Sequence, residues 1–528
     1  MFYAPLSDAP RDLAASMRAV VRAPLAWLLL LFSTLYLVTL FPGVGGIINH
    51  GDSAKFQFIG KVVGISHPPG NPLYMLLNAG WARLPLPCRL FTKASLLSTF
   101  SGVMTLAYVY RTLARLFDSR AGLAGAVALG TGSLFWIFAT EPEVYTLNTF
   151  LLAAACYYAA VFAETGEEKP FLAGALFISL GFANHLTSAM LLPGAAFLVF
   201  VRLRQGADLR RRDVGIVLAF ILLSASFYLY IPWRIHAGAA YNEFDEPLTW
   251  ASFWNYITAK KFQDSFVHLT FEAGVRDRLP VIMQLLQRQW IWPLLFVIPT
   301  GMLALWKRAP LFAAFVGMSL VGLLVFAFEY DIEDPDGFYM PVVLLLSFGI
   351  GGAMAAAEKK LPRARWVALG ALLGIPAAVH VMAWSRKSGF ELVEGIDGQE
   401  KPVLWNLDDL FTQIPEGAKF AVPCAHYGCV EVLNYYRFGE TVLDAKHVEY
   451  VRFSNLDTGY WDDKVAVVEF DRAKDQTICS IRKDDALAMR AKRARVDENL
   501  RPTLDVREGT LQGAVLYCSR PEQRSPPR

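Results

Sequence analysis

The sequence predicts an α-helical polytopic membrane protein of about eleven transmembrane helices, followed by a small C-terminal α/β domain outside the membrane. First, 54% of the 528 residues are hydrophobic and 18% are charged, which is typical of a membrane protein and not of a soluble enzyme. Second, apolar segments long enough to cross about 30 Å of hydrocarbon recur through the first three-quarters of the chain. Third, the remaining quarter is more polar. The net charge of +3 is too small to indicate a nucleic acid partner.

Eleven segments have the length and composition of crossing helices. No small-residue cleavage site follows the first of them, so we interpret it as an anchor and not as a removable signal peptide. The predicted helices lie near residues 25–41, 93–115, 120–139, 143–163, 170–186, 187–203, 214–234, 289–306, 310–329, 338–357 and 364–384.

Basic residues orient these helices, because the cytoplasmic loops of membrane proteins carry an excess of Lys and Arg. The loops near 140–142, 186–187 and 329–337 contain no Lys or Arg, whereas the alternate loops are basic. The basic residues on that side are Arg11, Arg18, Arg22, Arg111, Arg115, Arg120, Arg202, Arg204, Arg210, Arg211, Arg212, Lys307, Arg308, Lys359, Lys360, Arg363 and Arg365. We therefore expect a multi-pass protein of the cell (inner) membrane, with its N-terminus in the cytoplasm and its tail outside.

The chain divides into a membrane domain, residues 1–384, and an extracytoplasmic domain, residues 385–528. Two long loops of the membrane domain, 42–92 and 235–288, face outward with the tail. Strand-like runs such as 465–470 alternate with helical stretches in the tail, which favours an α/β domain. An oxidising exterior permits two disulfides among its four cysteines, with the pairing left open. These cysteines are Cys424, Cys429, Cys479 and Cys518.

The first outward loop contains a carboxylate, Asp52, close to the end of the first predicted helix. A carboxylate beside the hydrocarbon is energetically unfavourable, so it is expected to have charged or hydrogen-bonding partners or a functional role. It could be the N-cap of a short surface helix whose Phe56, Ile59 and Val63 form an apolar stripe on the membrane. It could also be a general base close to a bound substrate. The two roles are compatible, because a cap leaves one carboxylate oxygen free.

A second segment of this loop restricts the backbone conformation: His-Pro-Pro-Gly-Asn-Pro at 67–72. The residue before each proline is pushed toward an extended conformation. Asn71 is then expected to cap an interfacial helix that has Pro72 at its first position. His67 either donates to a phosphate or braces the turn.

Other polar residues are expected on the same side of the membrane. Thr140 and Glu143 have the spacing of a capping box, which leaves Glu141 without a structural explanation. His185 is either a helix-end histidine or a ligand-binding one. Arg234 either snorkels beside an aromatic belt or pairs with a lipid phosphate, and Lys260 and Lys261 could serve the same end.

The residues indicate no certain metal or cofactor. Five acidic residues between 329 and 336 surround an Asp-Pro-Asp-Gly turn, and a proline at a ligand position excludes an EF-hand. A turn is the simpler interpretation, and a loosely held divalent cation is the alternative. The spacing of Cys424 and Cys429 does not match a zinc ribbon.

The motifs together resemble the family called domain of unknown function 2723. The specific elements are Gly-Asp-Ser-Ala at 51–54 and Ile-Ser-His-Pro-Pro-Gly-Asn-Pro-Leu-Tyr at 65–74. Supporting matches lie at 143–148, 184–185, 230–234 and 248–262, with a looser one at 330–341, so that the resemblance covers roughly 25–380. The family belongs with the GT-C glycosyltransferases and includes a eukaryotic transmembrane protein O-mannosyltransferase.

The resemblance implies a GT-C fold and transfer of a sugar from a polyprenyl-phosphate carrier to a protein or glycan acceptor. Asp52 would take the place of the catalytic acid that GT-C enzymes carry in the first loop. The family often has a glutamate three residues later, where this chain has Lys55. The lysine could weaken activity, could indicate that the catalytic roles are distributed differently among the residues of the site, or could contact a phosphate. The expected substrate-binding residues are Lys55, His67, Glu141, Glu143, Tyr145, His185, Arg234 and Lys261.

The hypothesis from the sequence is therefore a glycosyltransferase in which Asp52 deprotonates the acceptor and the sugar is transferred with inversion. A transporter or flippase of lipid-linked intermediates is the main alternative. Transporters usually carry ionisable residues deep within their spans, whereas here these residues cluster at helix ends, and no internal repeat is present. A non-catalytic scaffold for the tail is a third interpretation, favoured only by Lys55.

Overall fold

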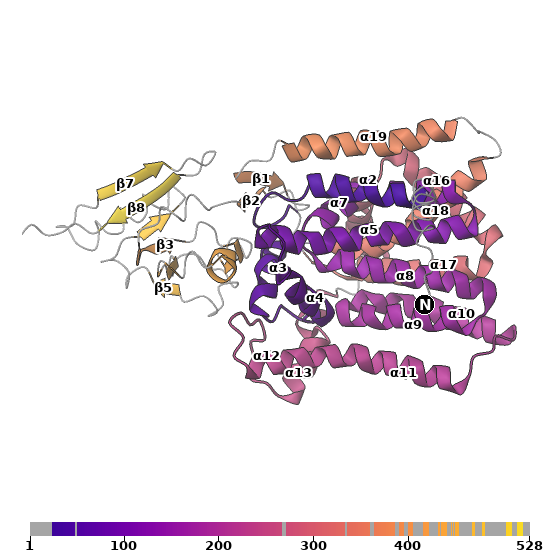
Figure 1. Ribbon diagram of the computed structural model, residues 1–528, viewed down its shortest axis with the longest axis horizontal. Helices are drawn as coiled ribbons and strands as arrows, with labels where there is room; N and C mark the ends of the chain where they lie inside the picture. The colour runs from indigo at the N-terminus through magenta and orange to yellow at the C-terminus, as the bar shows by residue number, and fades with distance from the viewer. Residues whose placement is uncertain are drawn as a thin grey trace, which may run out of the picture.

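In the computed structural model of the protein, the helices lie side by side in one bundle and the strands gather beyond one end of it (Figure 1). The structure describes residues 24–47, 50–266, 271–332, 335–358 and 364–385 of the helical part. From the tail it describes residues 390–394, 400–404, 416–421, 431–432, 434–440, 445, 447, 449–452, 467–469, 478–480, 503–508 and 515–520.

The first half of the chain forms long helices joined by short connections. Its helices are α2 (Pro24–Val38), α3 (His50–Val62), α4 (Pro72–Ala82), α5 (Leu90–Leu116), α6 (Ser119–Thr131), α7 (Ser133–Thr140), α8 (Val144–Thr165), α9 (Glu168–Asn184), η1 (Leu186–Leu191), α10 (Leu192–Arg204), α11 (Arg211–Ser226), η2 (Phe227–Leu229), α12 (Tyr230–His236) and α13 (Trp250–Ile257). The later helices are η3 (Lys260–Ser265), α14 (Phe271–Asp277), α15 (Leu279–Gln289), α16 (Trp292–Arg308), α17 (Pro310–Glu329), η4 (Pro335–Tyr339), α18 (Met340–Glu358), α19 (Ala364–Ser385) and η5 (Tyr435–Gly439).

Helix occupies each of the eleven ranges in which the sequence predicts a crossing. Among the described residues, six helices are long and apolar enough to cross a membrane, or up to eight if each of two bent pairs is one span. The bends are 70° between α6 and α7 and 98° between Gly274–Gln289 and α16. The protein is thus a multi-pass helical membrane protein, and the figure of eleven crossings stays a prediction.

The bundle is built around α5, which packs against α2, α6, α7 and α8, while α18 packs against α6 and α16. The core between these helices is apolar and includes the fully buried Leu106, Phe135 and Phe312. Helices α16 and α18 approach closely, since a Cβ on Gly301 would lie 1.6 Å from the carbonyl oxygen of Gly349. Such contacts between small residues are typical of helix pairs in membranes.

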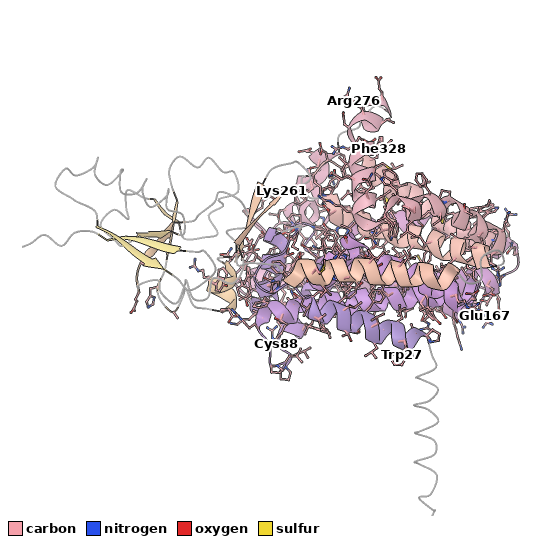
Figure 2. All side chains as sticks on the ribbon, turned by 90° about the horizontal axis from the view of Figure 1, so that it is seen from above. Trp27, Cys88, Glu167, Lys261, Arg276 and Phe328 are labelled. Atoms are coloured by element: carbon pink, nitrogen blue, oxygen red, sulfur yellow. The ribbon has the colours of Figure 1, made fainter. Side chains whose placement is uncertain are left out.

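The connections of the bundle lie at two opposite ends. One end carries α3, α4, α12 and α13, next to the strands of the tail (Figure 1). Figure 2 shows Lys261 toward this end and Glu167 at the other. The far end also holds ion pairs between its connections: Arg115 Nε lies 2.7 Å from Glu164 Oε2, and Arg212 Nη2 lies 2.6 Å from Glu168 Oε2. The two long loops and the tail therefore share one end, opposite several of the basic connections.

The tail contains a two-stranded antiparallel sheet of β1 (Phe390–Glu394) and β2 (Glu400–Leu404), and a six-stranded mixed sheet. The order in the larger sheet is β5-β4-β3-β6-β8-β7, with β3 parallel to β4 and β6, and β8 antiparallel to β6 and β7. Its strands are β3 (Lys419–Ala421), β4 (Glu449–Arg452), β5 (Val467–Glu469), β6 (Ile478–Ser480), β7 (Thr503–Glu508) and β8 (Val515–Arg520).

This sheet fits an α/β domain, but most segments that join its strands lie outside the described residues, so the domain's class and limits stay predictions. Cys479 stands opposite Cys518 in the register of β6 and β8. Cys424 and Cys429 lie outside the described residues. The disulfide pairing remains open.

The prediction of a surface helix at Asp52 was wrong in two respects. Helix α3 begins at His50, which places Asp52 inside the first turn and not at the N-cap. The apolar residues of α3 also do not form an exposed stripe, because Phe56 and Ile59 are each 1% exposed. They are covered by α4 and by the tail element η5, both of which pack against α3.

The capping box predicted at Thr140 and Glu143 does not form. Thr140 ends α7, and its hydroxyl donates to the carbonyl oxygen of Trp136 at 3.0 Å. Glu143 is itself the N-cap of α8, without a side-chain cap bond. The helix predicted after Asn71 is confirmed as α4, with Pro72 at its start. Asn71 precedes it with a φ of 41° and makes no side-chain cap bond.

Candidate active site

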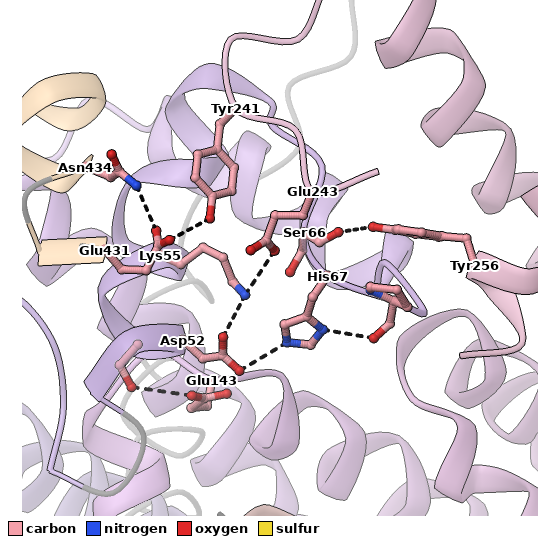
Figure 3. Close-up of polar contacts among 12 residues, drawn as sticks. Asp52, Lys55, Ser66, His67, Glu143, Tyr241, Glu243, Tyr256, Glu431 and Asn434 are labelled. Atoms are coloured by element: carbon pink, nitrogen blue, oxygen red, sulfur yellow. Dashed lines mark hydrogen bonds and ion pairs between the residues drawn. The ribbon is translucent and has the colours of Figure 1, made fainter. Parts of the chain in front are cut away.

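Helix α3 brings Asp52 and Lys55 together, because side chains three residues apart share one face of a helix. Lys55 Nζ lies 2.6 Å from Asp52 Oδ1 (Figure 3). The Lys55 side chain is fully buried, whereas the Asp52 side chain retains 16% of its exposure. Lys55 is thus an internal counter-ion for Asp52.

His67 holds the second oxygen of the same carboxylate. Its Nε2 lies 3.1 Å from Asp52 Oδ2, and its Nδ1 lies 2.9 Å from the carbonyl oxygen of Pro68. The two ring nitrogens thus face a carboxylate on one side and a backbone carbonyl on the other, which orients the ring. Of the two side chains that hold Asp52, His67 is the accessible one, with 31% of its side chain exposed.

A third charged residue arrives from the second long loop. Ile65 and Asn242 form a short parallel bridge, in which Ile65 N donates to Tyr241 O at 2.9 Å and Glu243 N donates to Ile65 O at 3.1 Å. This pairing carries Glu243 to Lys55, with Oε2 3.3 Å from Nζ. The hydroxyl of Tyr256 also donates to the carbonyl oxygen of Ser66.

The electrostatics of this cluster keep Asp52 ionised. Burial alone would raise the pKa of its carboxyl, but Lys55 and His67 hold that pKa far below its usual range. Burial likewise disfavours the charged form of Lys55. The negative charges nearby outweigh this effect and raise the pKa of its ammonium group; they belong to Asp52, Glu243 and Glu431. The cluster therefore contains a carboxylate that stays charged throughout the physiological pH range.

Glu143 lies next to this cluster and, unlike Asp52, favours the protonated form. Burial, reinforced by the negative charge of Asp52, raises the pKa of the Glu143 carboxyl well above its usual value. It is 1% exposed, and the Ser53 hydroxyl donates to its Oε1 at 3.4 Å. Of these two neighbouring carboxyls, Asp52 thus favours the ionised form and Glu143 the protonated form. Such a difference separates acid and base roles in active sites.

Glu141 anchors the backbone of the first loop. The backbone N–H of Ile47 donates to Glu141 Oε2 at 2.8 Å, and the Glu141 residue is 2% exposed. Gly46 is in close contact with it, since an added Cβ would lie 2.5 Å from both Glu141 Oε2 and Ser53 Oγ. Glu141 therefore holds the chain that leads into α3.

We expect Gly46→Ala to displace this loop and with it α3. The added methyl group must displace both Glu141 and Ser53, which are buried, and overpacking of this kind typically costs about 1–3 kcal/mol of folding stability. Thermal unfolding of the variant in detergent measures the loss. The matched control is Gly215→Ala, because an added Cβ there meets nothing within 4 Å. Equal stability of the two variants would contradict the role of Glu141.

Tyr145 and His185 form an aromatic cluster with Phe338. Ring centroids lie 5.3 Å apart between Tyr145 and His185, and 5.4 Å apart between His185 and Phe338. His185 follows α9, and its Nδ1 lies 2.8 Å from the hydroxyl of Thr187. These contacts agree with the helix-end interpretation of His185.

Arg234 and Lys261 do not join the Asp52 cluster in the part of the chain that the structure describes. Arg234 Nε donates to the carbonyl oxygen of Val63 at 2.7 Å, and its Nη2 lies 3.3 Å from that of Val62. It therefore caps the C-terminal end of α3. Lys261 is exposed in η3 (Figure 2).

Several members of the cluster escaped the sequence analysis, namely Tyr241, Glu243, Tyr256 and Glu431. Glu431 comes from the tail, is 3% exposed, and accepts a hydrogen bond from the Tyr241 hydroxyl at 2.9 Å. No motif or spacing in the sequence marks these residues, because the loop pairing at Ile65 and the docking of the tail bring them to the cluster.

The acidic stretch near residue 331 pairs with arginines. Arg278 Nη2 lies 2.5 Å from Asp331 Oδ2, and Arg288 Nη1 lies 2.9 Å from Asp336 Oδ1. Residues 333–334 lie outside the described chain. Within the described residues there is no group of three or more His, Cys, Asp or Glu side chains arranged to hold a metal ion.

The arrangement of the helices is shared with a solved membrane-protein structure. The chain superimposes on the crystal structure of ArnT from Cupriavidus metallidurans bound to undecaprenyl phosphate with a TM-score of 0.59, at 12% identity, over 93% of this chain and 97% of that one. The apo form of the same protein gives a TM-score of 0.53 at 13% identity, over 96% and 98%. At this identity, the likeness shows the shared fold alone.

More particularly, the chain is similar to protein O-mannosyl-transferases. A family model for the N-terminal domain of the protein O-mannosyl-transferase TMEM260 matches residues 52–208. Protein O-mannosyl-transferase tmem260 of Dictyostelium discoideum is 23% identical over 202 residues, 34% of this chain and 24% of the relative. TMEM260 of Mus musculus is 24% identical over 313 residues, 56% and 43%. The match thus spans less than half the length of either relative.

These similarities support the resemblance drawn from the motifs at the level of an O-mannosyltransferase-like GT-C protein. Membership of the domain of unknown function 2723 family stays a prediction. The family model begins at Asp52 and includes Lys55, His67, Glu141, Glu143, Tyr145 and His185.

Proposed function

We propose that the protein transfers mannose from a polyprenyl-phosphate carrier to a protein acceptor, on the extracytoplasmic side of the cell membrane. The observation that carries this proposal is the Asp52 carboxylate, whose two oxygens are held by Lys55 and His67 in the first loop of a GT-C fold. The sugar and the acceptor follow from the names of the relatives, and the carrier follows from the undecaprenyl phosphate bound to ArnT.

Asp52 is the base of the proposed reaction. The hydroxyl oxygen of the acceptor forms a bond to the anomeric carbon, the bond from that carbon to the phosphate oxygen breaks, and polyprenyl phosphate leaves on the opposite face with inversion. The hydroxyl proton passes to Asp52. Because its bonds to Lys55 and His67 make the ground-state carboxylate a weak base, transfer of the proton occurs late, when the forming bond has made the hydroxyl acidic.

His67 is the residue that offsets the charge on the departing phosphate, by donating a hydrogen bond from its ring. Lys55 was expected to share this role, but a fully buried ammonium engaged by Asp52 and Glu243 supports a positioning role instead. His67 is partly exposed and adjacent to the same carboxylate. Stabilising charge that develops in a transition state usually contributes about 3 kcal/mol per donor.

The contacts of the other predicted substrate-binding residues support different roles. Glu141 and Arg234 contact backbone at the two ends of α3, which supports a positioning role. Glu143 and His185 are buried and Tyr145 is partly buried, whereas Lys261 is exposed in η3, where it would meet carrier or acceptor. No step of the proposed reaction requires a metal.

The decisive experiment uses the purified full chain in nanodiscs with mannosyl-phospho-polyprenol, radiolabelled in the sugar, and candidate acceptor proteins. We expect label on the acceptor and stoichiometric release of polyprenyl phosphate. A parallel assay in vesicles measures transbilayer movement of the labelled lipid. Movement without transfer would establish the flippase alternative, and neither activity across a panel of carriers and acceptors would contradict an enzyme.

A further inference from the structure

The last two strands of the tail form a hairpin that is attached to the larger sheet by short ladders. β7 and β8 pair with one another over six residues, at one edge of this sheet (Figure 1). Within the described residues, β8 pairs in turn with β6 over three residues, and β6 pairs with β3 over two. Strands of globular proteins usually contain about 5–6 residues. The attachment of this C-terminal hairpin therefore depends on few backbone hydrogen bonds.

Two cysteines are directly opposite one another in this attachment. In the antiparallel register of β6 and β8, Cys479 is the partner of Cys518, at the middle of the three residue pairs. The Cα atoms of opposite residues in antiparallel strands are about 4.5 or 5.5 Å apart. Both separations lie within the range of about 4.4–6.8 Å that a disulfide spans without movement of the backbone. The backbone is thus already arranged for a disulfide at this position.

The register gives neither cysteine another thiol as a neighbour. On the other side of β6, Cys479 is opposite Phe420 of β3, and on the other side of β8, Cys518 is opposite Asp505 of β7. The two remaining cysteines of the tail lie outside the described residues, and they are separated by only four residues in the sequence. The described strands therefore favour one pairing out of those that the sequence left open.

We propose that Cys479 and Cys518 form a disulfide that joins the C-terminal hairpin covalently to the rest of the sheet. The two thiols lose two protons and two electrons as the sulfur–sulfur bond forms. The electrons reduce the disulfide form of a thiol–disulfide oxidoreductase outside the cytoplasm, where such bonds persist. The bond closes a long loop, residues 480–517, and thereby restricts the unfolded chain. The inference requires an extracytoplasmic tail and is independent of the proposed transferase activity.

Peptide mapping of the purified full chain tests the pairing directly, because cleavage by trypsin separates the cysteines of the tail. The peptides are 475–482 with Cys479, 508–524 with Cys518, and 420–437 with both Cys424 and Cys429. Free thiols are alkylated in denaturant before digestion, and no reductant is added. We expect 475–482 and 508–524 to appear as one linked species that separates when a reductant is added.

Two results of this map would overturn the inference. One is a link between peptide 420–437 and either of the other two peptides. The other is alkylation of Cys479 and Cys518 before any reduction, which would show that both are free thiols. Cys88 is the internal control for alkylation, because it is a free cysteine that is partly exposed.

Variants test whether the bond stabilises the tail. In Cys479→Ala, Cys518 should be alkylated without reduction. The double variant Cys479→Ala/Cys518→Ala should unfold about 5 °C below the wild type, because loss of a disulfide that closes a long loop is strongly destabilising. Cys88→Ala is the matched control and should keep both the linked peptides and the wild-type unfolding temperature. If the double variant unfolds at the same temperature as Cys88→Ala, the bond does not hold the hairpin in place. The map of the wild type requires no variant to fold.

Discussion

Asp52→Asn is expected to lower the rate of sugar transfer by about 10²- to 10⁴-fold, the usual contribution of a general base. The asparagine is isosteric and its oxygen still accepts from Lys55, so the helix start keeps its shape. It cannot take the proton of the acceptor hydroxyl. Single-turnover transfer with saturating donor isolates the chemical step, and we expect donor affinity to change much less than the rate.

The matched control for this variant is Asp208→Asn. Asp208 has a side chain that is 79% exposed and pairs with Arg210 at the far end of the bundle. It should transfer sugar at the wild-type rate. Asp52→Asn protein that is folded, binds donor and transfers at a rate within twofold of Asp208→Asn would remove Asp52 from the mechanism.

Lys55→Met is expected to have the largest effect on stability. It leaves two carboxylates facing one another, with the Asp52 and Glu243 side chains only 16% and 10% exposed. Removing one partner of a buried ion pair costs about 3–5 kcal/mol, and the residual exposure places this site toward the lower end of that range. Loss of the ammonium group should also let the pKa of the Asp52 carboxyl rise. We therefore expect the transfer rate of the variant to fall at low pH, where the wild-type rate does not.

Lys55→Arg tests whether charge alone suffices. A guanidinium group is larger and planar, and the Lys55 side chain is fully buried, so we expect the variant to recover part of the stability and little of the rate. Lys169→Met, at an exposed position, provides the matched control for removing a lysine. If Lys55→Met unfolds at the same temperature as Lys169→Met, Lys55 does not act as an internal counter-ion.

The sequence predicted much of the helical architecture, because crossing helices leave long apolar segments that need no tertiary information. It was less reliable where a helix start depends on neighbours. Thr140 and Glu143 have capping-box spacing, yet Thr140 is the last residue of α7 and its hydroxyl bonds back into that helix, while α8 begins only at Val144. The stripe of α3 was assigned to the membrane, because nothing local shows that α4 and η5 cover it.

The site was predicted in part for the same reason. Asp52, Lys55 and His67 lie within one loop, and their motif identified them. The assignment of Lys55 to phosphate could not be checked without knowing its burial, which depends on residues far along the chain. Glu243 reaches Lys55, and Glu431 reaches Tyr241, only through the bridge at Ile65 and the docking of η5, two long-range contacts that leave no periodic signal.

The central claim is that the donor headgroup binds beside Asp52 and His67. A structure of the full chain with a non-transferable polyprenyl phosphonate sugar tests it most directly. We predict a phosphonate oxygen within hydrogen-bond distance of a His67 ring nitrogen and the anomeric carbon facing the Asp52 carboxylate. A headgroup bound at the other end of the bundle, near Glu164 and Glu168, would contradict the account.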